Sequence, residues 1–199
     1  GDKMSLTVHA SKPSWIRKYL FSLDHKVIAI QYLTVGLIFL AIGGMMAYII
    51  RWQLAHPWQP VPVIGPLIFP DTGGAVMPEI YTKLFTAHGG IMVFFAVTPI
   101  IIGALGNFTI PLEVGAKDMA FPRVNMISFW ALFIGGALVI ASLFVPGGTA
   151  DTGWTLYPPL SSSLKVSPGW GIDLFILGLA LDEVSLLLGG INYIVTLLK

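Results

Sequence analysis

The chain contains no cysteine in its 199 residues. Without thiols it can form no disulfide framework, and it cannot hold zinc, an iron-sulfur cluster or a dinuclear copper centre through thiolates. Any metal bound by this part of the protein must therefore be held by histidine, carboxylate or carbonyl groups.

Charged residues are also scarce, at 11% of the chain, and the formal net charge is only +1. The sequence has no basic stripe that could release counterions from a nucleic acid, which excludes nucleic acid as a partner. Hydrophobic residues make up 55% of the chain, a composition typical of an integral membrane protein surrounded by a lipid bilayer.

The N-terminal segment, residues 1–26, lacks the pattern of a secretory signal. It is polar, and it has no apolar core followed by a cleavage site of small residues. We expect this segment to lie in the cytoplasm.

Four apolar runs are long enough to cross about 30 Å of hydrocarbon at about 1.5 Å per residue. They are residues 27–50, 84–105, 126–145 and 172–198. We predict an all-α integral membrane domain over residues 27–199, in which Pro99 kinks the second helix.

The distribution of Lys and Arg predicts the orientation of these helices. When the N-terminus is placed in the cytoplasm, eight of the eleven basic residues fall on the cytoplasmic side. These eight are Lys3, Lys12, Arg17, Lys18, Lys26, Lys117, Arg123 and Lys199. The sequence thus predicts a four-pass protein with its N-terminus inside.

His88 is the one ionisable residue of the apolar run 84–105, where an imidazole is costly unless it has a partner. It could donate a hydrogen bond across the bundle, or it could bind a haem iron, with Gly89 and Gly90 leaving space for the porphyrin edge. Arg51, predicted to lie level with His88, could extend its side chain to the membrane surface or contact a haem substituent. Spacing alone leaves these alternatives open.

A second polar cluster is predicted at the cytoplasmic ends of the helices, formed by Asp118, Asn107, Asn125 and Asn192. A carboxylate that collects protons, with amides that order water, is what a proton inlet requires. Helix capping is the alternative, because Asp118 precedes the third predicted helix and Asn107 follows the second.

Several motifs of the chain, in this order, resemble subunit I of the A-type haem-copper oxidases. They are Ser-Leu-Asp-His-Lys at 22–26, Thr-Ala-His-Gly at 86–89, Gly-Asn-Phe at 106–108, the stretch 115–125, and Thr-Gly-Trp-Thr-Leu-Tyr-Pro-Pro-Leu at 152–160. The resemblance extends over roughly residues 15–198.

The resemblance implies cofactor contacts for four residues. His88 aligns with an axial ligand of the low-spin haem, which is expected to be haem A, and Arg51 with the arginine that contacts the haem formyl group. Trp154 aligns with a tryptophan near the propionates of the high-spin haem, and Tyr157 falls in the same cofactor-binding loop.

The resemblance also implies a proton pathway of the D type. Its residues would be the entrance acid Asp118, the asparagine gate Asn107, Asn125 and Asn192, and the hydroxyls of Ser128 and Ser185. No residue of this chain is implied to be catalytic.

The fourth predicted helix departs from the family pattern. Many relatives have His-Leu-Ala-Gly followed by a serine pair, whereas Leu186 here replaces the second serine and Asp182 and Glu183 lie about 15 Å deep by helical rise. One hypothesis is that one of these acids joins the proton pathway. The alternative is a structural, hydrogen-bonded acid between helices.

The implied function is that of the catalytic subunit of a respiratory terminal oxidase, which reduces oxygen to water with electrons from cytochrome c and pumps protons. The chain is expected to be the N-terminal portion of a bundle of roughly twelve helices in a bacterial plasma membrane, and by itself not catalytic. The high-spin haem and copper B are expected in the remainder of subunit I. Further expected partners are subunit II with a copper centre, subunit III, and cytochrome c or a fused c-type domain.

Three other functions compete with that of a terminal oxidase supplied by cytochrome c. Quinol-oxidising family members carry polar residues at positions that here are Ile42, Met46, Ile80 and Lys83, so a quinol donor is disfavoured. An independent four-helix haem cytochrome would need paired histidines within the spans, which contain only His88. A transporter or assembly module could use Asp182 and Glu183 to bind ions.

Overall fold

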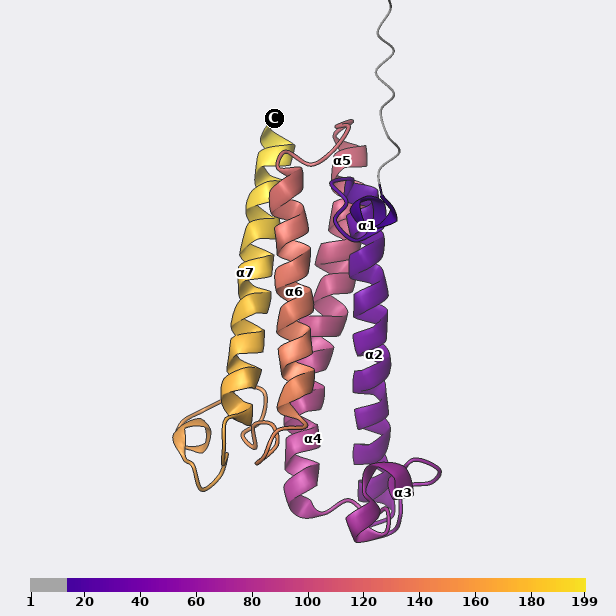
Figure 1. The fold of residues 1–199 in the computed structure, drawn as a ribbon, viewed down its shortest axis with the longest axis vertical. Coiled ribbons are helices and arrows are strands. Elements are labelled where there is room, and N and C mark those ends of the chain that lie inside the picture. Colours follow the sequence, from indigo (N-terminus) through magenta and orange to yellow (C-terminus); the bar gives the residue numbers. More distant parts are fainter. Residues whose placement is uncertain (1–13) are drawn as a thin grey trace, which may run out of the picture.

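The computed structural model describes residues 14–199 (Figure 1). Residues 1–13, half of the predicted cytoplasmic segment, lie outside the described residues. The elements are α1 (Trp15–Tyr19), α2 (His25–Ala55), α3 (Gly65–Ile68), η1 (Pro70–Thr72), α4 (Pro78–Gly90), η2 (Ile91–Val97), η3 (Pro99–Gly106), α5 (Asn107–Glu113), α6 (Pro122–Ser142), η4 (Leu160–Ser162) and α7 (Gly171–Leu198). The described chain contains no strand, which confirms the all-α prediction.

Four helices in residues 14–199 are long and apolar enough to cross a membrane, as predicted. They are α2, the continuous helix Pro78–Glu113 formed by α4, η2, η3 and α5, then α6 and α7. The second helix begins six residues before its predicted start, because Pro78 occupies its first turn and hydropathy detects only the part that suits hydrocarbon. Pro122 likewise starts α6 before position 126.

The spanning helices form a bundle with two distinct ends (Figure 1). α1, α5 and the C-terminal end of α7 lie at one end, called here the α1 end, and α3 with the loop between α6 and α7 lies at the opposite, α3 end. α6 and α7 pack along each other, and α2 packs against α4, η2 and η3. Successive helices therefore alternate in direction.

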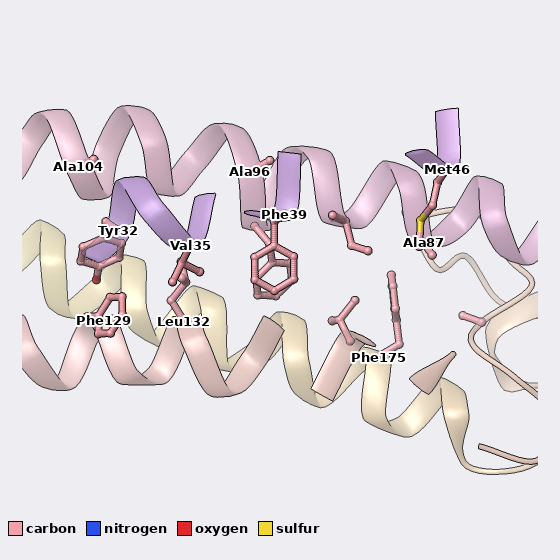
Figure 2. Close-up of a cluster of buried hydrophobic side chains, with 14 of the residues drawn as sticks. Tyr32, Val35, Phe39, Met46, Ala87, Ala96, Ala104, Phe129, Leu132 and Phe175 are labelled. Carbon is pink, nitrogen blue, oxygen red and sulfur yellow. The ribbon is translucent and has the colours of Figure 1, made fainter. Parts of the chain in front are cut away.

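A continuous apolar core fills the space between the helices. Figure 2 shows Tyr32 of α2 beside Phe129 of α6, with Phe39 of α2 further along the bundle and Phe175 of α7 beyond it. The rings of Phe39 and Phe95 lie 5.4 Å apart. Because lipid is as apolar as these side chains, dispersion from close packing holds the helices together.

Pro99 lies within the second spanning helix, where its ring cannot donate a backbone hydrogen bond. The helix accommodates it with wider, π-helical turns from Ile91 to Val97 and from Pro99 to Gly106. The hydroxyl of Thr98 donates to the carbonyl of Val93 at 2.7 Å. The helix continues past the proline to Glu113.

Gly135 of α6 and Gly178 of α7 lie where the backbones of these two helices pack directly against each other. A Cβ added at either glycine would lie 2.6 Å from the carbonyl oxygen of the other. Small residues at such a crossing let helix backbones pack directly in a membrane.

We predict that Gly178→Ala separates α6 from α7 and lowers the stability of the intact complex by about 1–3 kcal/mol, because the new methyl meets backbone that cannot rotate away. The measurement is thermal unfolding followed by circular dichroism. The matched control is Gly190→Ala in the same helix, where no heavy atom of the described chain lies within 4 Å of the new carbon. Equal melting temperatures for the two variants would contradict the close crossing.

Candidate functional site

His88 is anchored to α2 by a hydrogen bond between its Nδ1 and the carbonyl oxygen of Gly43, at 2.9 Å. The ring is half-buried and lies at the level of Gly43. Arg51 is exposed and lies eight residues further along α2, about 12 Å by helical rise. The prediction that Arg51 is level with His88 is wrong, because the second helix starts earlier than expected and His88 lies correspondingly deeper.

The hydrogen bond to Gly43 fixes the tautomer of the neutral His88 ring. A carbonyl oxygen only accepts, so Nδ1 carries the proton and Nε2 keeps its lone pair. A carbonyl acceptor at one ring nitrogen is the usual support for a histidine that binds metal through the other. The residue therefore fits an axial haem ligand. The hydrogen bond across the bundle, which the sequence offered as the alternative to iron binding, leaves Nε2 available.

His88 has no companion ligands in the described chain. Residues 14–199 contain no group of three or more His, Cys, Asp or Glu side chains placed to hold a metal ion. A metal at His88 would need its other ligands from a cofactor or from chain outside these residues.

The glycines that follow His88 accommodate aromatic side chains of the same chain. A Cβ on Gly89 would lie 2.9 Å from Cδ1 of Trp154, and one on Gly90 would lie 2.7 Å from Cζ of Phe175. The prediction that both leave space for a porphyrin edge is wrong for this reason.

Trp154 reaches this region from the loop between α6 and α7. Its ring lies 5.9 Å from that of Phe94, and the neighbouring Gly153 donates its N–H to Thr86 Oγ1 at 2.9 Å. The loop thereby brings Trp154 against the helix that carries His88. Tyr157 is 69% exposed, and the described structure does not bring it into this cluster.

Asn107 and Asn125 form a buried pair toward the α1 end of the bundle. Asn125 donates from Nδ2 to Asn107 Oδ1 at 2.5 Å, and Asn107 donates from its own Nδ2 to the Gly103 carbonyl at 2.7 Å and to the Tyr193 hydroxyl at 3.0 Å. His25 Nδ1 bonds to the Asn107 carbonyl at 2.8 Å. Asn107 lies inside the continuous helix Pro78–Glu113, so the capping alternative is wrong for this residue.

Asn192 and Asp118 make no side-chain hydrogen bond to this pair in the described chain. Asn192 accepts from the Phe121 N–H at 2.9 Å and donates to the Phe121 carbonyl at 3.2 Å, which fixes the start of α6 to α7. Asp118 is half-buried and accepts from the Met119 N–H at 2.7 Å. The N-cap of α6 is Phe121, so capping by Asp118 is also wrong.

Tyr32, Ser128 and Ser185 form a buried hydroxyl cluster between α2, α6 and α7. Ser128 Oγ donates to the Ser185 carbonyl at 2.7 Å, so the Tyr32 hydroxyl donates to Ser128 Oγ, also at 2.7 Å. The three residues and Tyr193 line a cavity of about 10 Å³, close to the smallest volume that holds one water.

Three residues of these two polar clusters, Tyr32, Tyr193 and His25, were not predicted from the sequence. Tyr32 and Tyr193 carry hydroxyls inside apolar runs, which is the signal that could have identified them. His25 was placed outside the spans, yet it is the first residue of α2 and only 2% exposed. Its contact is a backbone carbonyl, for which the sequence carries no signal.

Asp182 and Glu183 have opposite environments although they are neighbours. Asp182 is fully buried, and neither of its carboxylate oxygens has a hydrogen-bond partner in the described chain. Glu183 is exposed on the described bundle, as expected for residues about 100° apart around a helix.

The four positions compared with the quinol-oxidising members line one cavity of about 830 Å³ near the α3 end. They are Ile42, Met46, Ile80 and Lys83. Of these only Lys83 is polar, and its Nζ donates to the carbonyl of Gly147 at 2.6 Å.

Known proteins similar to this chain were found by two comparisons. A family profile described as "Cytochrome C and Quinol oxidase polypeptide I" matches residues 27–199. Cytochrome c oxidase subunit 1 of Synechocystis sp. is 43% identical over 98% of this chain. The probable cytochrome c oxidase subunit 1-beta of Nocardia farcinica and the alternative cytochrome c oxidase subunit 1 of Bradyrhizobium diazoefficiens are each 41% identical over 94% of it.

These matches confirm the resemblance drawn from the motifs. The chain spans about a third of the length of the curated relatives it matches, 32% of the Synechocystis protein and 29% of each of the other two. Because the profile covers most of the chain and the relatives match nearly all of it, the chain belongs to the cytochrome c and quinol oxidase polypeptide I family of helical integral membrane proteins.

Proposed function

We propose that this chain is part of the catalytic subunit of a respiratory terminal oxidase, which reduces oxygen to water and couples that reaction to proton pumping. The observation that carries the proposal is the His88 ring, held by the Gly43 carbonyl with Nε2 left free in a membrane helix of an oxidase family. Oxygen chemistry itself would take place on residues and cofactors outside this chain.

His88 would bind the iron of a low-spin haem through Nε2, and the haem, when bound, supplies one-electron transfer. The Gly43 carbonyl orients the ring and raises its basicity as a ligand. Arg51 would contact the formyl group of this haem, for which haem A is the expected subtype. Trp154, with Tyr157 in the same loop, would lie near the propionates of the high-spin haem. A high-spin haem and copper B would be held by the remainder of the subunit.

The polar groups at the α1 end would admit protons. Asp118, half-buried at that end, would collect them, and the Asn107–Asn125 pair would order the water that carries them inward. Asn125 Oδ1 is a buried acceptor without a partner in the described chain, the kind of atom that normally binds an internal water. The hydroxyl cluster and its water-sized cavity continue the path, and Asn192 would position its entrance.

We further propose that the α1 end faces the cytoplasm of a bacterium and that the chain works in the plasma membrane with subunits II and III. The donor would be cytochrome c or a fused c-type domain. The large cavity at the quinol-type positions supports this, because its walls offer one ammonium and no carboxylate, imidazole or amide to bind a quinol head.

A first prediction concerns the haem ligand. His88→Asn keeps an N–H donor for Gly43 but cannot bind iron well, so the intact complex should lose its low-spin haem and its oxygen consumption. Optical and electron paramagnetic resonance spectra measure the haem. His56→Asn, at an exposed histidine, is the control. A full low-spin signal in the His88 variant would refute this assignment.

A second prediction concerns the proton inlet. Asp118→Asn should slow oxygen reduction by about 10²-fold, the loss expected when a group that transfers protons is removed, while the haem spectra stay unchanged. The measurement is turnover of the complex reconstituted into vesicles. Asp173→Asn removes an exposed carboxylate at the α3 end and should leave turnover intact. If both variants turn over equally, Asp118 is not the entrance.

A third prediction concerns the electron donor. The purified complex should consume oxygen with reduced cytochrome c, and a short-chain quinol should give no rate above that of quinol autoxidation. Oxygen-electrode assays with each donor measure both rates. A quinol rate equal to the cytochrome c rate would favour the quinol-oxidising alternative.

A further inference from the structure

Asp182 is the one acid of α7 that the bundle encloses, and its carboxyl group lacks any partner in the described chain. It is 0% exposed, and both oxygens are unpaired. The described residues by themselves bury the Asp182 carboxyl group completely. No further part of the protein is needed to shield it from solvent. An unpaired buried carboxyl is stable only if it is protonated or bonded to an internal water.

The surroundings of Asp182 contain no group that could neutralise it by pairing. The apolar parts of the four spanning helices, residues 27–50, 84–113, 124–142 and 171–198, contain no Lys or Arg. Its titratable neighbours are Tyr32 of α2, whose hydroxyl contacts Ser185, and Glu183, the next residue of its own helix. A structural ion pair, the usual reason for a buried acid, is therefore absent from the described chain.

The position of Asp182 along α7 continues the proposed proton path. The buried face of α7 carries Asn192 and Ser185 before Asp182 and becomes apolar beyond it, with Gly178 and Phe175. Asp182 lies about 4.5 Å from Ser185 along the helix axis and on the same face, so one water can join the two side chains. It is the last polar group on that face toward the α3 end.

Leu186, on the same face of α7, is a break in the proposed proton path that an acid at position 182 can bridge. Leu186 lies one turn from Asp182 and lines the water-sized cavity beside Ser185, but its side chain can neither donate nor accept a proton. The hydroxyl cluster therefore offers no further hydroxyl on α7, and Asp182 supplies an ionisable group at i−4 from Leu186.

We propose that Asp182 carries protons in this protein: its carboxylate accepts a proton that arrives through the hydroxyl cluster, and the resulting carboxylic acid releases one toward the α3 end. This rests on the proposed oxidase function. Glu183 takes no part, because it is exposed and points about 100° away from the path.

The test uses the intact complex with Asp182→Asn, Asp182→Ala and the control Glu183→Gln. Redox-induced infrared difference spectra should show a carbonyl band of a protonated carboxylic acid that shifts in D₂O. That band should be missing in both Asp182 variants and present in Glu183→Gln. Turnover should fall about tenfold or more in the Asp182 variants with unchanged haem spectra, since a proton-transfer group is lost.

Asp182→Ala protects the test from a folding failure, because alanine buries no polar group and suits a helix. A carbonyl band that persists in either Asp182 variant, or unchanged turnover and protons pumped per electron in both, would overturn the proposal. Failure of the oxidase function itself would appear differently, as a wild-type complex without haem bands or oxygen consumption.

Discussion

Every polar side chain within this bundle must find its partner inside the protein, because lipid supplies no donor or acceptor. The bonds that result join the helices: His88 to Gly43 links α4 to α2, Asn125 to Asn107 links α6 to α5, and Ser128 to Ser185 links α6 to α7. Among the buried atoms without a partner in the described chain, Asn125 Oδ1 and the two carboxylate oxygens of Asp182 are the ones that we assign to water and protons.

These hydrogen bonds lie in two regions of the molecule, each with a proposed function. His88, the proposed haem ligand, lies toward the α3 end on the helix that Trp154 covers. The proposed proton inlet lies at the α1 end, where His25 and Tyr193 bond to Asn107. The hydroxyl cluster and Asp182 lie between them, close to the crossing of α6 and α7 at Gly135 and Gly178. The residues that we propose to carry electrons and protons are thus held by one set of packed helices.

The sequence predicted the four spans and the family because long apolar runs and ordered motifs are local properties. It could not predict that Gly43 anchors His88, since a backbone carbonyl has no residue signature, and it misplaced Arg51 because Pro78 starts the helix before the hydropathy rises. The space beside Gly89 and Gly90 was likewise misjudged, since Trp154 and Phe175, which fill it, are distant in sequence. Contacts between helices required the three-dimensional structure.

The most direct test of this account is a high-resolution electron cryomicroscopy structure of the intact complex in lipid. The account predicts that His88 Nε2 coordinates the iron of a haem while Nδ1 keeps its bond to the Gly43 carbonyl. A structure in which Nε2 is hydrogen-bonded to another side chain, and every haem iron takes its ligands elsewhere, would contradict it.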